Sequence, residues 1–221
     1  MNTAIIIMAK VPTAGNVKTR LEPSLTPEQC AELAECFLLD TVGKAEFLPN
    51  QIIIAYTPFE KRDVLLKILP THKTLIEQKG TNLGDRMFHA LNFAFSQNAD
   101  AVVMIGTDSP TFPPEFIERA FENLKSADAV LGKTKDGGFY LLGLRTLRKE
   151  IFENVAWSSA ETFAQTSRNI EKIGLKLSLL PTWFDVDFPA DLERLRKDLA
   201  ENPIIAPRTF EWLKKNYKRQ S

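Results

Sequence analysis

The chain is poor in three features that would each place it in a special class of protein. Its 221 residues include only two cysteines, Cys30 and Cys36, so a disulfide framework is not expected and a reducing cytoplasm is the expected location. Basic and acidic residues number 28 each, so no net charge attracts the protein to nucleic acid or to acidic membranes. The apolar run "AIIIM" near the start is too short for a signal peptide or a membrane span, and we interpret it as a buried strand.

Short apolar segments alternate along the chain with segments of helical pattern. The apolar segments are rich in β-branched residues, as strands buried on both faces are. The expected strands are 3–9, 51–57, 73–78, 100–107, 128–133, 137–144 and 175–183. The expected helices are 26–47, 59–69, 82–97, 113–126, 158–174, 189–203 and 207–218. This alternation, without a repeat or a linker, predicts one domain over residues 1–221: a Rossmann-like α/β fold with a mostly parallel mixed sheet flanked by helices.

Charged or glycine-rich segments follow the expected strands at four places. These segments are 10–20, 105–110, 133–143 and 184–192. In an open α/β sheet, ligands bind beyond the carboxyl ends of the strands. We therefore expect the four segments to surround one cleft, with cations in the first segment and acids in the other three.

Five motifs, in their order along the chain, carry a resemblance to a known family: MAKVPTAGNVKTRL, LGDRM, GTDSP, DGGFYLLG and DVDFPADL. Together they resemble the small bacterial glycosyltransferases of the GT-A, or nucleotide-diphospho-sugar transferase, fold. Within that family, the motifs are most similar to the group linked to arsenosugar biosynthesis. The resemblance extends from residue 3 to about residue 199, and it implies this fold and a nucleotide-sugar ligand.

The first motif is unusually basic for a connection between a strand and a helix. We interpret Lys18, Arg20 and Lys10 as cations that bind a nucleotide diphosphate, since arginine offers a planar fork to phosphate oxygens and lysine a mobile charge. Gly15 would let the backbone approach the diphosphate. The alternative is that these are solvated charges on a loop. Under the first interpretation, residues 11–19 should be mobile or poorly packed without a ligand, because their cations await an anion.

The acids that follow the later strands point to a divalent metal. Asp108 ends a very apolar strand, where a carboxylate is costly unless a cation meets it, and Mg²⁺ or Mn²⁺ with diphosphate oxygens would do so. Asp108 could instead form a turn or a helix cap. Asp185 and Asp187 lie two apart in an extended segment, so both could face one cation. The resemblance implies Asp187 as the second ligand, with Asp185 near it, although Asp187 or a neighbour could simply cap the following helix.

One acid of the family pattern is missing. Many GT-A glycosyltransferases carry Asp-x-Asp at the end of this strand, but Gly106 stands where the first acid is expected. The site resembles that of a sugar-phosphate nucleotidyltransferase in this respect.

The segment DGGFYLLG has two adjacent glycines before an aromatic strand. A hairpin turn explains Gly137 and Gly138. The resemblance implies in addition that these glycines let a sugar or an acceptor lie against the backbone. It also implies that Asp136 reaches the hydroxyls of that ligand or acts as a base.

The segment QKGTNLGDRM, residues 78–87, has a similar composition. Gly80 would permit a tight backbone there, and Arg86 could meet a nucleobase or a phosphate. Alternatively, Arg86 pairs with Asp85 or with another surface acid.

Three functions are compatible with these residues. The first, which the resemblance favours, is a glycosyltransferase that uses a nucleotide sugar, a small-molecule hydroxyl acceptor and Mg²⁺ or Mn²⁺. The second is a nucleotidyltransferase that joins an NTP to a sugar phosphate or another phosphate and releases pyrophosphate. Both need Lys18, Arg20 and Asp108 to stabilise phosphoryl charge. The third is a non-catalytic nucleotide-binding regulator, which would tolerate the loss of Asp108.

Overall fold

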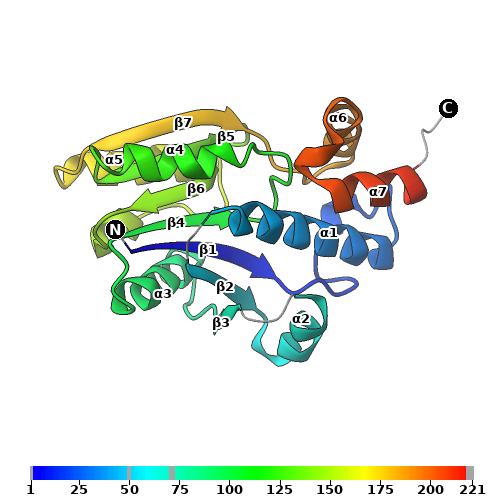
Figure 1. Cartoon of the computed structure of the whole chain (residues 1–221), viewed down its shortest axis with the longest axis horizontal. Helices are drawn as coiled ribbons and strands as arrows, with labels where there is room; N and C mark the ends of the chain where they lie inside the picture. Colours follow the sequence, from blue (N-terminus) through cyan, green and yellow to red (C-terminus); the bar gives the residue numbers. More distant parts are fainter. Residues whose placement is uncertain (1, 49–50, 70–72, 218–221) are drawn as a thin grey trace.

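The chain forms one seven-stranded sheet in the order β3-β2-β1-β4-β6-β5-β7 (Figure 1). The computed structural model describes residues 2–48, 51–69 and 73–217. The strands are β1 (Thr3–Lys10), β2 (Gln51–Thr57), β3 (Thr74–Glu77), β4 (Ala101–Gly106), β5 (Ala129–Thr134), β6 (Phe139–Leu144) and β7 (Leu177–Trp183). All run parallel except β6, which is antiparallel to both of its neighbours. The predicted α/β fold with a mostly parallel mixed sheet is confirmed.

A tight turn after β5 explains the position of β6. The amide of Gly137 donates to the carbonyl of Thr134 at 3.2 Å, and the amide of Thr134 donates to the carbonyl of Gly138 at 2.9 Å. Gly137 has a φ of +95°, which glycine adopts without steric cost. The turn returns the chain beside β5, so β6 fills the place between β4 and β5 and leaves the other edge of β5 to β7.

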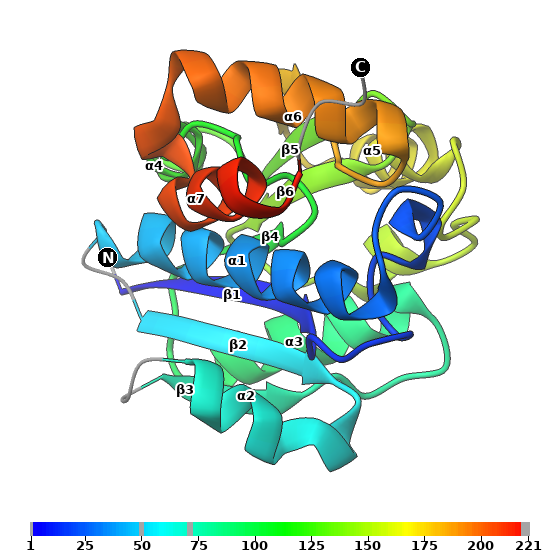
Figure 2. The same ribbon diagram turned by 90° about the vertical axis from the view of Figure 1, so that its right-hand side faces the viewer.

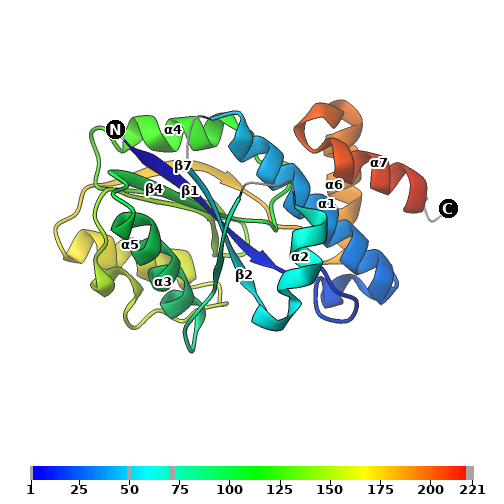
Figure 3. The ribbon, with the colours of Figure 1, turned by 60° about the horizontal axis from the view of Figure 1, so that its bottom comes forward.

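Helices cover both faces of the sheet (Figure 3). They are α1 (Pro27–Glu46), α2 (Arg62–Ile68), α3 (Leu83–Ser96), α4 (Glu115–Asn123), α5 (Thr162–Lys172), α6 (Pro189–Glu201) and α7 (Pro207–Asn216). Ile5 and Ile7 of β1 pack with α1, α2 and α4, whereas Ala4 and Ile6 pack with α3 and α5. Alternate residues of β1 therefore enter two different cores, which explains why the strand is apolar throughout.

A third core lies on the outer side of α1, where α6 and α7 pack (Figure 2). The buried carboxylate of Asp40 on α1 accepts hydrogen bonds from the amides of Arg208 and Thr209, at 3.1 and 2.9 Å, and so caps the start of α7. The same core contains Leu21 from the basic segment and Val186 from the segment after β7. Both of these segments reach the carboxyl edge of the sheet, so this core also holds two walls of the site.

The expected elements are present, with shifts of a few residues at their ends. The helix expected from residue 113 begins at Glu115, and the helix expected from residue 158 begins at Thr162. The last expected helix ends at Asn216, and residue 218 lies outside the described residues. Short 3-10 helices at Thr19–Leu21 (η1), Phe59–Lys61 (η2), Lys149–Phe152 (η3) and Pro203–Ile205 (η4) were not predicted as such. Among the described residues, no helix has the length and apolar character needed to cross a membrane.

Candidate functional site

A cleft of about 650 Å³ opens at the carboxyl ends of the parallel strands. Predicted site residues that line it are Lys10, Lys18, Arg20, Arg86, Asp108, Asp136, Gly138, Asp185 and Asp187. The other predicted residues, Gly15, Gly80 and Gly137, lie outside its lining. A more open depression of about 760 Å³ lies against α1 and α7 and contains none of the predicted residues. The cleft at the strand ends is therefore the candidate site.

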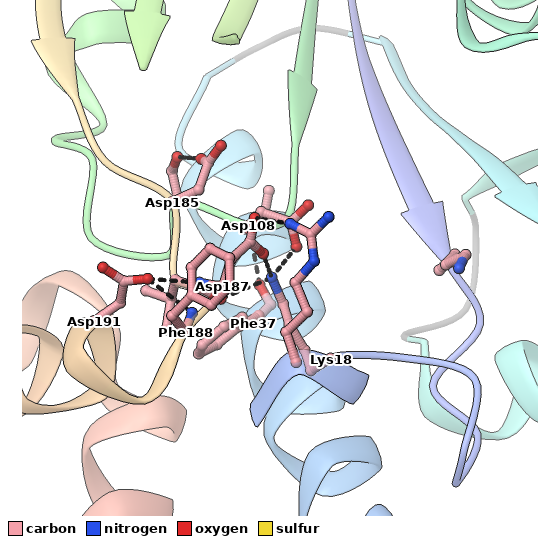
Figure 4. A network of polar contacts seen from close by, with 12 residues as sticks. Lys18, Phe37, Asp108, Asp185, Asp187, Phe188 and Asp191 are labelled. Carbon is pink, nitrogen blue, oxygen red and sulfur yellow. Dashed lines mark hydrogen bonds and ion pairs between the residues drawn. The ribbon is translucent and has the colours of Figure 1, made fainter. Parts of the chain in front are cut away.

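Lys18 lies at the centre of an ionic cluster in this cleft (Figure 4). Its Nζ forms an ion pair with Asp108, contacts Asp187 Oδ1 at 3.1 Å and donates to the carbonyl of Val186 at 2.9 Å. Only 8% of the Lys18 side chain is exposed. Burial alone would lower the pKa of Lys18, but the charges of Asp108 and Asp187 outweigh that effect and raise the pKa above its ordinary value.

The prediction that this loop carries unpaired cations is therefore wrong for Lys18. The expected poor packing of residues 11–19 is also wrong for part of the loop, because Val11 and Val17 are buried. Lys18 itself has a φ of +50° and directly precedes the short helix η1. The long-range pairing explains the difference, since the two acids that satisfy Lys18 follow β4 and β7, far along the chain.

Arg20 and Lys10 differ from Lys18 in being accessible. The Arg20 side chain is 65% exposed, and its Nη1 lies 3.8 Å from Asp187 Oδ2. Its guanidinium group lies over the ring of Phe188, at 5.3 Å from the centroid. The Nζ of Lys10 donates to the carbonyl of Asn16 at 3.3 Å, at an exposed position. Both side chains can thus reach a ligand in the cleft without leaving a buried partner.

Asp185 and Asp187 face the cleft from the extended segment after β7. Phe184 and Val186, which alternate with them, are buried in the third core, so the predicted common orientation of the two acids is confirmed. Asp185 accepts a hydrogen bond from the hydroxyl of Ser109. Burial, followed by the charge of Asp108, raises the pKa of Asp185 to about 7.

Asp191, rather than Asp187, provides the cap of α6. Its Oδ2 accepts hydrogen bonds from the amides of Asp187 and Phe188, at 3.1 and 2.8 Å. The side chain of Asp187 is thereby left to contact Lys18 and Arg20 (Figure 4). Of the alternative in which Asp187 or a neighbour caps this helix, the part that names Asp187 is wrong, because the neighbouring Asp191 provides the cap.

Asp136 both stabilises the turn after β5 and lines the cleft. Its Oδ1 accepts hydrogen bonds from the hydroxyl of Thr134 at 2.6 Å and from the amide of Gly138 at 3.1 Å. At Gly137, an added Cβ would overlap the carbonyl group of Ala160, so this glycine is needed for packing. Gly138 lines the cleft, and the hairpin and site interpretations of this segment are compatible.

Gly80 and Arg86 have separate roles near the start of α3. An added Cβ on Gly80 would overlap Asp85, and the φ of Gly80 is +145°, so the residue serves the local backbone. Asp85 accepts hydrogen bonds from the amide and the hydroxyl of Thr81, and within the described chain it forms no ion pair with Arg86. Arg86 is half-buried and lines the cleft. The alternative in which it pairs with Asp85 is therefore wrong.

The sequence did not identify three further residues at or beside the site. Gln78 lines the cleft, and its Nε2 joins the ends of β1 and β2 by donating to the carbonyls of Ala9 and Ala55, at 3.2 and 2.8 Å. Ser109 binds Asp185, and its place in GTDSP was the available signal. Lys44 gave no signal, because a lysine within a helix normally lies at the surface.

Lys44 is buried on α1 and supports the segment that carries Asp108. Its Nζ donates to the carbonyl of Pro110 and lies over the ring of Phe112, 5.1 Å from the centroid. Burial lowers the pKa of Lys44 to about 8, and the charge of Asp40 offsets only part of this effect.

Asp108 and Asp187 together can hold one cation. Both contact the ammonium group of Lys18, which shows that one positive charge fits between them. Among the described residues, there is no group of three or more His, Cys, Asp or Glu side chains that could hold a metal ion. A pair of carboxylates suits Mg²⁺, which typically uses one or two carboxylates and completes its shell with waters and substrate phosphates. The predicted closeness of the two acids is confirmed, and the metal itself stays a prediction.

The sheet order and the cleft at its carboxyl edge define an α/β protein with the nucleotide-diphospho-sugar transferase fold. The chain belongs to the family described as "Uncharacterized protein conserved in bacteria (DUF2064)", whose model matches residues 39–159. The crystal structure of a "putative nucleotide-diphospho-sugar transferase" from Desulfovibrio desulfuricans G20 is 30% identical to it. This likeness covers 98% of the present chain and 96% of the other, with a TM-score of 0.92. No curated protein matches the chain.

More distant structures share the fold alone. A cytidylyltransferase from Leptospira borgpetersenii serovar Hardjo-bovis has a TM-score of 0.57 at 14% identity, covering 98% of this chain and 95% of that one. A protein from Mycobacterium tuberculosis H37Rv, in complex with manganese, has a TM-score of 0.52 at 17% identity, covering 88% and 97%.

Proposed function

We propose that the protein is a nucleotide-sugar-dependent glycosyltransferase that moves a sugar from a nucleoside diphosphate to a hydroxyl group of a small-molecule acceptor. The observation that carries this proposal is the uneven distribution of charge in the cleft. Its lining cations all come from residues 10–20 and from Arg86, whereas the lining from residues 136–162 has one carboxylate, that of Asp136, and several hydroxyls but no lysine or arginine. A diphosphate matches the first part by charge, and a neutral hydroxyl compound matches the second.

The diphosphate of the donor would bind at the end of β1. Arg20 offers a planar fork for two phosphate oxygens, and Lys10 adds a mobile charge. Arg86, at the start of α3, would bind the nucleobase or a further phosphate oxygen. Gly15 and Gly80 would act through the backbone conformation of their loops, because neither lines the cleft.

A divalent cation, Mg²⁺ or Mn²⁺, would be held by Asp108 and Asp187, with Asp185 beside them. When bound, it would supply positive charge against the leaving diphosphate. The donor set supports this assignment, because two carboxylates that already share one ammonium group lie at the cleft. The manganese complex of the distant mycobacterial structure is in line with it.

The acceptor would lie against the turn after β5 and the segment before α5. This part of the cleft is lined by Gly138, Ser158 and Ser159. Because Gly137 has no Cβ, the segment before α5 can pack directly against the turn. The acceptor hydroxyl oxygen would form the new bond to the anomeric carbon, while the bond from that carbon to the diphosphate breaks. Asp136 would take up the hydroxyl proton, because its carboxylate lies at the cleft and is already oriented by Thr134.

A nucleotidyltransferase is the second candidate, and Gly106 favours it. Gly106 replaces the first acid of Asp-x-Asp, and an added Cβ would meet no atom within 4 Å, so packing does not explain this glycine. One observation argues against this candidate. The phosphate of a second substrate would lie near the acids Asp136 and Asp185, and the same part of the cleft has no lining lysine or arginine to bind it.

A thermal-shift panel tests the two candidates against each other. UDP-, GDP-, ADP- and dTDP-sugars and free NTPs would each be added with and without Mn²⁺. We expect a nucleotide sugar to raise the melting temperature more than any NTP, in a metal-dependent manner. A larger shift with an NTP, together with pyrophosphate release when sugar phosphates are added, would support the nucleotidyltransferase instead. Nucleotide binding that persists in Asp108→Ala would indicate a non-catalytic regulator.

We also place this activity in the cytoplasm. The proposal rests on the low cysteine content, because chains with few cysteines are common in reducing compartments; Cys30 is buried and Cys36 half-buried on α1. The resemblance to the group linked to arsenosugar biosynthesis stays a prediction, and it does not identify the acceptor.

A further inference from the structure

The ammonium group of Lys18 already uses its full bonding capacity. A lysine ammonium has three N–H donors. In this structure its partners are Asp108, Asp187 Oδ1 and the carbonyl of Val186. Lys18 therefore cannot bind a phosphate oxygen unless it gives up one of these partners.

Asp108 and Asp187 likewise have to give up a partner, the Lys18 ammonium group, before they can share a metal ion. A divalent ion bound by the Oδ1 atoms of Asp108 and Asp187 would occupy the place where the Lys18 ammonium lies now. Two cations in the same small, partly buried space repel each other strongly. Lys18 and the metal are therefore alternatives at this pair of acids.

The surroundings of Lys18 allow this exchange without disruption of the loop. Val17 and Leu21 are buried on either side of it, which fixes the backbone. The lysine side chain has a flexible four-carbon stem, and its Nζ lies 5.6 Å from the centroid of the Phe37 ring, at the wall of the cleft. Because Lys18 lines the cleft, rotation of this stem would carry the ammonium group away from the acids and toward the place where a diphosphate would bind.

We propose that Lys18 and a divalent metal ion compete for the carboxylates of Asp108 and Asp187, and that metal loading releases Lys18 to the nucleotide diphosphate. The proposal rests on the proposed function for the identity of the ligands. In the unloaded protein, Lys18 neutralises two acids that would otherwise repel each other. With metal bound, Lys18 becomes a third cation, beside Arg20 and Lys10, that can bind the diphosphate of the nucleotide sugar. Lys18 thus couples the binding of metal to the binding of nucleotide.

Arg20 provides a matched control for this proposal. It is also a cation beside Asp187, but at 3.8 Å and with 65% of its side chain exposed, and within the described residues its ion pair is with Asp187 and not with Asp108. Removing Arg20 takes the same charge from the cleft without opening the space between the acids.

The test is a titration with Mn²⁺ in the absence of nucleotide, followed by the electron paramagnetic resonance signal of the free ion. We expect Lys18→Met to bind Mn²⁺ at least about tenfold more tightly than the wild type, equivalent to about 1.4 kcal/mol. Arg20→Met should change the affinity much less, and Asp187→Asn in the Lys18→Met background should remove the gain. Equal affinities of the two single variants, or no Mn²⁺ binding by any variant, would overturn the proposal.

A second measurement on the wild-type protein does not depend on the folding of a variant. Lysine acetylation, mapped by mass spectrometry, should be slow at Lys18 without metal and several-fold faster at saturating Mg²⁺, while the exposed Lys10 stays unchanged. Lys18 that remains protected when Mg²⁺ is bound would contradict the exchange. If nucleotide sugars still bind in that case, the proposed function stands and only the exchange is overturned. If no nucleotide sugar binds, the proposed function is overturned, and the Mn²⁺ titration alone decides whether the exchange occurs.

Discussion

The backbone amide of Val186 donates a 2.8 Å hydrogen bond to the backbone carbonyl of Asp108. This bond joins the segment after β7 to the segment after β4. It places Asp187, the next residue, within reach of the Lys18 ammonium group that also contacts Asp108. The candidate site is thus assembled by backbone pairing between two distant segments, and the ionic cluster forms on that frame.

Substitution of Lys18 should reduce stability more than substitution of Arg20. Lys18→Met leaves two neighbouring carboxylates without their shared cation, and we expect a loss of about 1–2 kcal/mol in the free energy of unfolding. Arg20→Met removes an exposed side chain and should cost no more than about 0.5 kcal/mol. Urea denaturation of both variants measures the difference. Equal losses would mean that the buried cluster contributes nothing beyond surface charge.

Substitution of Arg20 should weaken nucleotide binding strongly, although it hardly changes the stability of the fold. Loss of its charge-assisted bonds in Arg20→Ala should cost on the order of 1.5–3 kcal/mol of binding, a tenfold to hundredfold drop. Arg20→Lys keeps the charge but removes the fork, so its affinity should lie between those of the wild type and Arg20→Ala. Calorimetry with the best nucleotide sugar provides the values. Affinity that is unaffected in both variants would place the diphosphate elsewhere.

Two glycines with positive φ should respond differently to alanine. Gly15 has a φ of +73° and no atom within 4 Å of an added Cβ, so Gly15→Ala should cost only the backbone strain, about 1–2 kcal/mol. Gly137 has a φ of +95°, and its added Cβ would overlap Ala160, so Gly137→Ala should cost clearly more. Thermal or urea unfolding of the two variants tests this ranking. A larger loss of stability in Gly15→Ala than in Gly137→Ala would show that the segment before α5 can shift to accommodate the added Cβ.

The stability of the fold should depend on pH through Lys44. Its pKa is lowered from 10.5 to about 8 by burial, so the folded state favours the neutral amine. Between these two values the unfolded chain binds more protons, and stability should therefore rise with pH from about 8 to about 10.5, by up to roughly 3 kcal/mol. The rise should be absent in Lys44→Met. Parallel pH dependences of the two proteins would show that Lys44 does not titrate in this range.

Much of the fold was predictable because its signals are local. The apolar run of β1 and the start of α1, where Thr26 caps the helix and Pro27 opens it, are each visible within a few residues of sequence. The positions of Asp108, Asp136 and Asp187 followed from the strand ends that they succeed. The common cleft followed from the rule that parallel strands bring their carboxyl ends together.

The parts that could not be predicted depend on contacts between distant segments. Nothing near Lys18 indicates that acids after β4 and β7 will satisfy it, and nothing near Lys44 indicates that it is buried. The position of β6 between β4 and β5 is likewise a choice of partners, which alternation of apolar residues does not specify. The hydrogen bonds that Asp191 accepts from the amides of Asp187 and Phe188 likewise became visible only in the structure.

The most direct test of the proposed function is a calorimetric titration of the wild-type protein and Asp108→Asn with UDP-, GDP-, ADP- and dTDP-sugars, each with and without Mn²⁺. We predict that at least one nucleotide sugar binds the wild type, that Mn²⁺ strengthens this binding, and that Asp108→Asn abolishes the effect of the metal while its melting temperature stays close to that of the wild type. Absence of binding by every nucleotide sugar, or binding that depends neither on Mn²⁺ nor on Asp108, would contradict a metal-assisted glycosyltransferase.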